Sequence, residues 1–405
     1  MDTQICNGIH WVGYVDWTVR DFHGYNTNRG ATYNSYLIED EQCALIDTVK
    51  GPYAQHLLAN VQGHVDLSRI KYVVCNHGEP DHSSGFPAVM KVLPHATILV
   101  SAKGQQTLNA YYDTDGWNMQ VVKTGDSVSL GNRTLHFLET PMVHWPDSMM
   151  TYVPQEKLLF SMDAFGQHYS SSYRFDDENP ITEIMAEART YYANIVTPYG
   201  GRVVKTMEAA AQLEIEVIAP SHGVIWRKHI PEILKAYRNW ALCKSRRKLL
   251  VIYDSMWGST AQMAQAICEG AMGANVEAKL IAIRQSDLTN IATEMLDAAA
   301  VAFGSSTLNQ EMLPPAAAAL TYLKGLRFTN RAAFSFGSFG WGKGGPEAVG
   351  EMLKACKWEL TRECLKAKYK PNQVALDECR AAGAELATKA IEIADAAGYE
   401  PLLID

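Results

Sequence analysis

The sequence is informative first in what it lacks. Its eight cysteines include no C-x-x-C pair, no run of 18 apolar residues occurs, and basic residues are not in excess, since the formal net charge is −8. The scattered cysteines predict reduced thiols and exclude a disulfide framework or a zinc knuckle. The missing apolar run argues against a membrane span. The acidic balance argues against a nucleic-acid surface.

The N-terminal segment also lacks a targeting pattern. Residues 1–7 show no basic stretch followed by an apolar one, so no signal peptide is expected. Together with the reduced cysteines, this predicts a cytoplasmic protein. At 405 residues the chain is too long for one comfortable core, which predicts at least two domains.

The segment at 73–82, VVCNHGEPDH, carries the strongest chemical signal of the chain. After a strand-like apolar run it places four potential ligands within six residues: His77, Glu79, Asp81 and His82. The glycine and the proline between them break regular structure, so the four side chains can turn toward one point. The alternative is a solvated loop with incidental histidines. The spacing favours a metal site at a strand end.

Further potential ligands each follow an apolar run of their own. His144 lies in a loop after such a run, Asp163 follows residues 158–162, and His222 follows residues 217–221. Sheet proteins collect binding residues in loops at strand ends. Seven ligands are more than one metal needs. The count therefore predicts two metals about 3.5–4 Å apart that share a bridging carboxylate.

A domain boundary is predicted near residue 247. Residues 230–242 have apolar residues at helical spacing, residues 244–248 form a basic hinge, and residues 249–253 have the length and composition of a buried parallel strand. The predicted domains are 1–247 and 248–405.

The strand predicted at 249–253 leads into a loop that suits a phosphate group. A helix is expected after it, and the loop consists of Ser255, Met256, Trp257, Gly258, Ser259 and Thr260. Backbone N–H groups and the helix dipole attract an anion, while hydroxyls donate from the sides. A capped helix start is the alternative for such a loop taken alone.

Two more loops follow apolar runs in the same region. The first contains Ser306, Thr307, Leu308 and Asn309, and the second contains Ser338, Phe339, Gly340, Trp341 and Gly342. Open α/β sheets bind ligands in loops at the carboxyl ends of successive parallel strands. The three loops together predict a cofactor site. Trp341 stands among glycines, which suits the face of a planar ring better than a protein core.

These motifs resemble a known family. The H-x-E-x-D-H loop followed by His144, Asp163 and His222 has the ligand order of the metallo-β-lactamase fold. Glu79 at the third position is similar to the flavodiiron proteins, whereas the hydrolases of that fold have histidine there. A carboxylate suits iron and an all-imidazole set suits zinc. Residues 248–405 resemble flavodoxin, whose FMN phosphate loop is S-x-x-G-S-T.

The resemblance covers the whole chain. It implies an α/β protein with an N-terminal metallo-β-lactamase-like αββα sandwich and a C-terminal flavodoxin-like doubly wound parallel sheet. It also implies two non-haem irons and one FMN per chain. The implied ligands are His77, Glu79 and His144 for the first iron, Asp81, His82 and His222 for the second, and Asp163 as the bridge.

Other residues receive a role only from the resemblance. His23 and Tyr192 match residues that line the substrate pocket, where they would supply protons or hydrogen bonds. Trp145 matches a residue at the junction between the flavin of one chain and the irons of its partner. The family forms head-to-tail homodimers, and a dimer of such dimers stays open.

The activity that the resemblance implies is reduction of nitric oxide to N2O, of O2 to water, or of both. Two ferrous ions and one reduced flavin together hold the four electrons that turn O2 into two waters. Residues 144–152 and 366–371 are more similar to the flavorubredoxins, which reduce nitric oxide. No rubredoxin module is present up to Asp405, so an external donor, rubredoxin or a similar reductase, is expected.

Two alternatives stay open from the sequence. One is a dinuclear zinc hydrolase fused to a flavodoxin domain, which Glu79 disfavours. The other is a plain electron carrier with a structural metal, which the seven-ligand set disfavours. The remaining histidines are interpreted as structural or solvated, and they stand at positions 10, 56, 64, 95, 136, 168 and 229.

Overall fold

The computed structural model describes residues 4–273 and 275–402, which fall into two compact units. The first unit contains residues 4–191 and 201–237, and the second contains Tyr192–Gly200 and Arg238–Leu402. The domain boundary near residue 247 stays a prediction. The expectations that touched residues 1–3 and 403–405 lie outside the described residues. Within the described part of the chain, no helix is long and apolar enough to cross a membrane.

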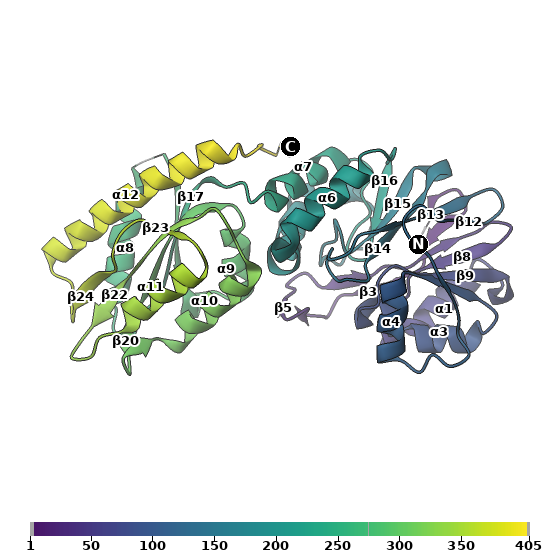
Figure 1. Ribbon diagram of the computed structural model, residues 1–405, viewed down its shortest axis with the longest axis horizontal. Coiled ribbons are helices and arrows are strands. Elements are labelled where there is room, and N and C mark those ends of the chain that lie inside the picture. The colour runs from purple at the N-terminus through teal and green to yellow at the C-terminus, as the bar shows by residue number, and fades with distance from the viewer. Residues whose placement is uncertain (1–3, 274, 403–405) are drawn as a thin grey trace. The chain divides into compact units, whose positions relative to one another are not determined.

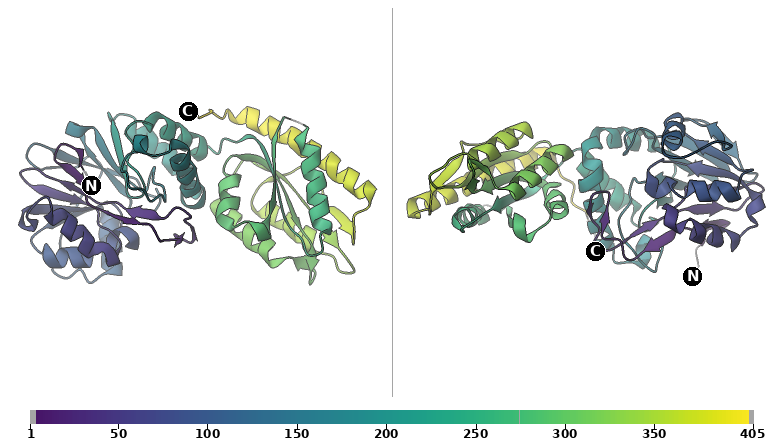
Figure 2. Two further views of the ribbon diagram at one scale, coloured as in Figure 1. Left: turned by 180° about the vertical axis from the view of Figure 1, so that it is seen from behind. Right: turned by 90° about the horizontal axis from the view of Figure 1, so that it is seen from below.

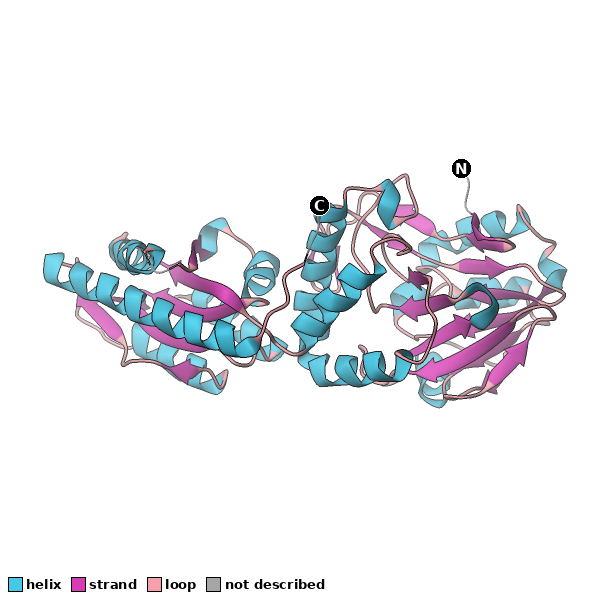
Figure 3. Ribbon diagram, turned by 90° about the horizontal axis from the view of Figure 1, so that it is seen from above, coloured by secondary structure: helices cyan, strands magenta, loops and turns pink. Residues whose placement is uncertain are grey.

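The first unit is built on two sheets (Figures 1 and 3). The larger sheet has the order β1 (Gln4–Cys6), β2 (Ile9–Trp11), β7 (Tyr36–Ile38), β8 (Cys43–Ile46), β9 (Ile70–Cys75), β10 (Thr97–Val100) and β11 (Asn118–Val121). The smaller sheet has the order β12 (Ser127–Ser129), β13 (Thr134–Glu139), β14 (Met149–Val153), β15 (Leu158–Met162) and β16 (Val217–Pro220). Two small two-stranded sheets pair β3 (Tyr14–Asp16) with β6 (Ala31–Tyr33) and β4 (Asp21–Phe22) with β5 (Tyr25–Asn26).

Apolar side chains hold the layers of this unit together. Between the sheets, Leu135 and Phe160 of the smaller sheet belong to one buried cluster with Ile46 and Val74 of the larger one. Each such side chain contributes about 1.5–3 kcal/mol when it leaves water. A second buried cluster lies between the larger sheet and its helices, which include α1 (Ala54–Gln62) and α3 (Phe86–Val92).

Helices also stand on the other side, alongside β15 and β16: α6 (Gly200–Ala210) and α7 (Ile230–Ala241) in Figure 1. The layers therefore follow the αββα order of the metallo-β-lactamase fold, as expected. The remaining helices of this part of the chain are α2 (Pro80–Ser83), α4 (Ala102–Tyr111) and α5 (Ile181–Tyr191).

The second unit is an open sheet of parallel strands with helices on both faces. Its order is β18 (Glu277–Ala282), β17 (Arg246–Asp254), β19 (Ala298–Ser305), β22 (Ala332–Phe339) and β23 (Glu359–Leu360), with β24 (Leu365–Lys368) also beside β22. In chain order this is 2-1-3-4-5, the doubly wound arrangement of flavodoxin. A short hairpin of β20 (Thr307–Leu308) and β21 (Glu311–Met312) follows β19.

Helices α8 (Ser259–Met272) and α12 (Gln373–Ala397) share one buried cluster with this sheet. The long helix α12, yellow in Figures 1 and 2, runs along the sheet. The remaining helices are α9 (Leu288–Met295), α10 (Pro314–Leu326) and α11 (Gly345–Ala355).

The expected helix at 230–242 and strand at 249–253 are confirmed, but the basic hinge at 244–248 is not. Strand β17 begins at Arg246, because its N–H donates to the Asp297 carbonyl. Lys248 is buried with its ammonium 2.7 Å from Glu294 and 2.9 Å from Asp297. Basic composition suggested a solvated hinge, but these carboxylates compensate the charge inside the unit.

Candidate metal centre and cofactor loops

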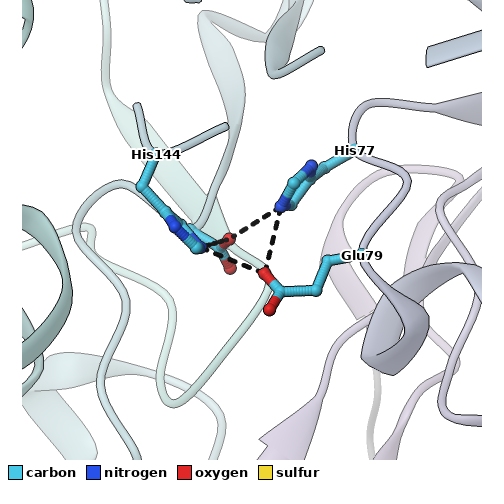
Figure 4. Close-up of side chains that lie close together, drawn as sticks. His77, Glu79 and His144 are labelled. Carbon is cyan, nitrogen blue, oxygen red and sulfur yellow. Dashed lines mark hydrogen bonds and ion pairs between the residues drawn. The ribbon is translucent and has the colours of Figure 1, made fainter. Parts of the chain in front are cut away.

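Four predicted ligands converge at the ends of strands in the first unit: His77, Glu79, His144 and Asp163. The Glu79 Oε2 atom lies 3.2 Å from His77 Nε2 and 3.1 Å from His144 Nε2. The Asp163 Oδ2 atom lies 3.2 Å from His144 Nε2 and 3.7 Å from His77 Nε2. Figure 4 shows the two imidazoles and the carboxylate pointing toward one another. One metal ion can take all four.

The remaining three ligands form a second group that shares Asp163. The Asp81 Oδ2 atom lies 3.1 Å from both His82 Nε2 and His222 Nε2. The Asp163 Oδ1 atom lies 3.2 Å from His82 Nε2 and 3.6 Å from His222 Nε2. Asp163 therefore presents one oxygen to each group, which is the geometry of a bridging carboxylate.

Local sequence explains how these side chains meet. Strand β9 ends at Cys75, and the chain then turns through Gly78, where an added Cβ would lie 2.6 Å from the Thr107 side chain. Pro80 occupies the first turn of α2, where its missing N–H costs no hydrogen bond. The tight turn and the short helix place Glu79, Asp81 and His82 around the end of β9, so the strand-break prediction for this loop holds.

Two histidines of the site are fixed from behind. The His77 Nδ1–H donates to the Asp147 carboxylate at 3.1 Å, and the His222 Nδ1–H donates to the Thr32 carbonyl oxygen at 2.6 Å. Each bond sets the tautomer and leaves Nε2 as the atom that faces the carboxylates. No role was predicted for Asp147 from the sequence. Its position three residues after His144 was the available signal.

The charges of the cluster favour a cation at its centre. Burial alone would raise the pKa of Glu79, but hydrogen bonds from His144 and His77 outweigh it and lower that pKa to about 2. Burial alone would lower the pKa of His144, but Asp163 and Glu79 raise it to about 9. The carboxylates are therefore anionic at neutral pH, and they stabilise any cation that reaches them.

Unpaired polar atoms give a direct test of whether metal fits. Among the described residues, buried atoms without a hydrogen-bond partner include Nε2 of His82, Oδ1 of Asp81 and both carboxylate oxygens of Asp163. Leaving such atoms buried and unsatisfied costs about 1–3 kcal/mol each, and more for charged groups. The atoms named above all belong to the two ligand groups. Metal coordination satisfies them, so the donor set fits a dinuclear centre.

His23 also lies at the centre, as the family resemblance implied. Its Nε2 is 3.6 Å from Glu79 Oε1 and 3.4 Å from Asp81 Oδ2. His168, interpreted from sequence as structural or solvated, is buried 5.3 Å from the His23 ring and accepts or donates one hydrogen bond with the Tyr25 hydroxyl at 2.8 Å. His168 lies in the loop that follows β15, and no motif marked it.

The tyrosine beside His23 is Tyr191. Its ring lies 6.3 Å from that of His23, and its buried hydroxyl has no hydrogen-bond partner among the described residues. Tyr192 instead packs its ring 5.2 Å from Trp240 and belongs to the second unit. Successive residues of a helix point about 100° apart, so the two tyrosines face different ways. The geometry therefore favours Tyr191 over Tyr192 as the pocket residue. The sequence prediction named Tyr192 because the direction of each side chain around the helix axis could not be determined from the sequence.

The three loops of the second unit meet at the carboxyl ends of β17, β19 and β22. The Thr260 hydroxyl lies 2.9 Å from both the Ser306 and the Ser338 hydroxyls. The Met256 N–H donates to the Ser306 hydroxyl at 3.4 Å, and Gly258 N–H donates to the Ser255 hydroxyl at 3.2 Å. Thr260 is fully buried and ties the loops together, while Ser259 opens helix α8.

Large aromatic side chains stand out from these loops. Trp341 is 95% exposed and Trp257 is 89% exposed, so neither is part of a core. Leu308 and Met256 are also exposed. Thr307 holds the Gly345 N–H at 3.1 Å and thereby links the second loop to the third. Exposed aromatic faces around a hydroxyl cluster suit a planar ring that carries a phosphate.

The remaining residues predicted in these loops lie with them. Asn309 follows β20 in the left-handed conformation, Phe339 ends β22, and Gly340 and Gly342 flank Trp341. Trp145, grouped with the cofactor by resemblance, lies in the first unit with its ring 5.0 Å from that of His77. It borders the first ligand group.

Comparison with known proteins agrees with both sites. Residues 31–223 match the ODP family of beta lactamases, and residues 251–383 match the flavodoxin family. The nitric oxide reductase of Moorella thermoacetica is 44% identical, over 95% of this chain and 98% of that protein. The crystal structure of the flavodiiron protein from Giardia intestinalis has a TM-score of 0.95 at 37% identity, covering 98% of each chain. The chain belongs to the flavodiiron protein family.

A second solved structure is similarly close. The rubredoxin oxygen:oxidoreductase of Desulfovibrio gigas has a TM-score of 0.94 at 37% identity, over 97% of this chain and 99% of that one. The likeness therefore spans both units of the flavodiiron chain. The family resemblance and the fold that it implied are confirmed.

Proposed function

We propose that this flavodiiron protein reduces nitric oxide to N2O, dioxygen to water, or both, at a non-haem diiron centre supplied with electrons by FMN. The observation that carries the proposal is the two-group cluster in which Asp163 presents one oxygen to each side. Glu79, which closes the first group, adds the carboxylate that favours iron over zinc. The similarity to a nitric oxide reductase supports nitric oxide as the first substrate to test.

We assign the first iron to His77, Glu79 and His144 and the second to Asp81, His82 and His222, bridged by Asp163. His82 is included because its Nε2 approaches both Asp81 and Asp163, whereas His23 Nε2 approaches Asp81 and Glu79. When bound, the two irons supply binding positions for the gas and two of the electrons it consumes.

The chain's own residues orient the metal ligands and supply protons to the substrate. Asp147 and the Thr32 carbonyl hold the Nε2 atoms of His77 and His222 toward the cluster. Burial raises the pKa of Tyr191 well above its usual range, and the nearby Asp163 charge adds to the effect. The Tyr191 hydroxyl therefore keeps its proton at neutral pH and can donate a hydrogen bond toward His23 and the substrate. His23 Nε2 is the atom best placed to pass a proton in.

We assign FMN to the three loops of the second unit. The hydroxyls of Ser255 and Ser259 and the N-terminus of α8 suit its phosphate, and the loop at 306–309 suits its ribityl chain. The indole of Trp341 suits the isoalloxazine face. FMN, when bound, carries the two electrons that return the irons to the ferrous state.

Assembly and donor follow from the family. We propose a head-to-tail homodimer in which the flavin of one chain serves the irons of its partner, with Trp145 at the junction. We further propose that a rubredoxin or a similar reductase supplies electrons, that the protein is cytoplasmic, and that the two domains meet near residue 247.

Metal content and turnover test the proposal together. Protein purified after iron-replete expression should carry about two irons and one FMN per chain. With one common reduced donor, it should consume nitric oxide under anaerobic conditions, O2 under aerobic conditions, or both. Zinc at full occupancy without gas turnover would support the fused zinc hydrolase instead. Iron and FMN without turnover of either gas would support the plain electron carrier.

A further inference from the structure

A second cluster of metal-ligating side chains lies in the first unit and shares no residue with the centre described above. It consists of His10, Glu39 and His64, each of which offers one ligand atom within 4.8 Å of the others. His10 Nε2 lies 2.8 Å from Glu39 Oε1, and the two imidazole rings stack with centroids 4.0 Å apart. The sequence interpretation took both histidines as structural or solvated.

The sheet fixes two members of this cluster. In the antiparallel pairing of β2 with β7, His10 lies opposite Leu37, and the Glu39 N–H donates to the Gly8 carbonyl two residues further on. His10 and Glu39 are thus diagonal neighbours on one face of the sheet. This is the face that α1 covers, and His64 follows the end of α1 after Gly63. Three segments of the chain therefore place one ligand each on the same face of the larger sheet.

Among the described residues, the cation beside Glu39 is paired with other carboxylates. The Arg133 guanidinium donates to the Glu39 backbone carbonyl at 3.2 Å, but its charge is paired with Asp40 at 3.6 Å and Glu156 at 2.8 Å. The Glu39 side chain is 31% exposed and that of His10 is 13% exposed, so an ion can reach them from solvent.

We propose that His10, Glu39 and His64 bind one Zn²⁺ ion per chain, with water in the fourth position. Two imidazoles and one carboxylate are an established three-ligand zinc set. Ligand atoms of one tetrahedral zinc lie about 3.3 Å apart, given metal–ligand distances of about 2.0–2.2 Å. The three atoms are already within about 1.5 Å of that separation.

Zinc binding turns the His64 ring out of its stack. Stacked rings have nearly parallel in-plane lone pairs, so both nitrogens cannot point at one ion until one ring rotates. His64 lies beyond the end of α1, whereas His10 is held within strand β2 (Ile9–Trp11), so His64 is the ring that rotates. The loss of this stacking opposes zinc binding. We therefore expect a dissociation constant in the micromolar range, weaker than that of a rigid site.

The test uses the iron-loaded full chain and Zn²⁺ alone. Calorimetric titration gives the affinity, and zinc and iron per chain are measured after gel filtration. Two variants remove ligands: His64→Ala, at an exposed position, and Glu39→Gln, which preserves side-chain shape. His95→Ala removes another exposed histidine and is the matched control. Thermal unfolding checks that each variant is folded.

The wild type should take up one zinc per chain without losing iron. Each ligand variant should bind that zinc about tenfold more weakly or worse, and His95→Ala should bind as the wild type does. The proposal is overturned if zinc enters only by displacing iron, if no zinc binds in the micromolar range, or if both ligand variants retain wild-type affinity. Because no residue is shared with the iron ligands, each of these results leaves the proposed function unaffected.

Discussion

Asp147 holds the His77 ring on the side away from the ligand cluster. The His77 Nδ1–H donates to the Asp147 carboxylate at 3.1 Å, and the opposite ring nitrogen faces Glu79 at 3.2 Å. Asp147 is itself buried and also accepts the Gly78 N–H at 2.6 Å. One carboxylate thus fixes both the ring and the loop that carries it. Mutation of such a partner behind a ligand typically lowers metal affinity or activity about 10–100-fold.

The first prediction is that Asp147→Asn lowers iron affinity about 10–100-fold. The amide keeps the volume but cannot hold the tautomer of His77 as a carboxylate does. Iron retained against a chelator series measures the loss. Asp113→Asn, at an exposed aspartate of the same unit, should retain iron as the wild type does. Equal iron retention in both variants would show that Asp147 does not orient His77.

A second prediction separates the two cofactors. Asp163→Asn removes a bridging oxygen and should abolish most gas reduction and iron binding while FMN stays bound. Trp341→Ala should weaken FMN binding about tenfold, because a stacked aromatic contributes about 0.5–1.5 kcal/mol beyond the area it buries, while iron content is unchanged. Iron and FMN per chain are measured in both. Loss of both cofactors from either variant would contradict the assignment of one site to each unit.

A third prediction concerns pH and a carboxyl outside both sites. Burial raises the pKa of Glu187 on α5 to about 7, assisted by the Glu183 charge and opposed by Arg29, whose Nε lies 3.3 Å away. In the unfolded chain this acid titrates near its ordinary value, so between about pH 4.5 and pH 7 the folded state holds a proton that the unfolded state releases. Glu187 therefore costs nothing at low pH and up to about 3 kcal/mol above pH 7.

Glu187→Gln should accordingly stabilise the first unit more at pH 8 than at pH 4. The measurement is the difference in thermal midpoint between variant and wild type at the two pH values, because the difference cancels the pH dependence of the metal ligands. Glu183→Gln removes a charge from the same helix and the same arginine, and should not reproduce the gain. A difference independent of pH would contradict the raised pKa.

A fourth prediction tests the buried ion group that replaced the expected hinge. Lys248→Met leaves Asp297 and Glu294 without their buried cation and should destabilise the second unit by about 3 kcal/mol. Denaturant unfolding followed by FMN fluorescence measures it. Lys354→Met breaks an exposed pair with Glu351 and should change stability by less than about 0.5 kcal/mol. Adding Asp297→Asn to Lys248→Met should restore part of the loss.

The sequence predicted what depends on local composition and spacing. The donors at 77–82 are adjacent in the chain, and His144, Asp163 and His222 each follow an apolar run, so strand ends located them without any knowledge of packing. The open sheet of the second unit followed in the same way from three loops after three strands. What local spacing could not give was helical phase, which decides between Tyr191 and Tyr192.

Contacts between distant segments were equally out of reach. The bond from His222 to the Thr32 carbonyl joins residues 190 positions apart, and the cluster of His10 with His64 depends on how α1 lies over the sheet. Lys248 shows the same limit. A basic run suggests solvent exposure, but here carboxylates from helix α9 (Glu294) and from the turn before β19 (Asp297) pair with the ammonium. Long-range pairing, rather than residue type, decides each of these positions.

The last prediction concerns assembly. If each flavin serves the partner's irons, a chain with a damaged iron site (Asp163→Asn) and a chain with a damaged flavin site (Trp341→Ala) should complement each other. In the mixed dimer, the intact flavin of the first chain meets the intact irons of the second, so activity should rise on subunit exchange although each parent is nearly inactive. Differently tagged chains purified through both tags isolate the mixed dimer, whose gas consumption should approach half that of the wild type because only one of its two flavin–iron pairs works. A flavin that serves its own chain leaves no chain with both centres intact. An inactive mixed dimer of proven composition therefore excludes the cross-chain route.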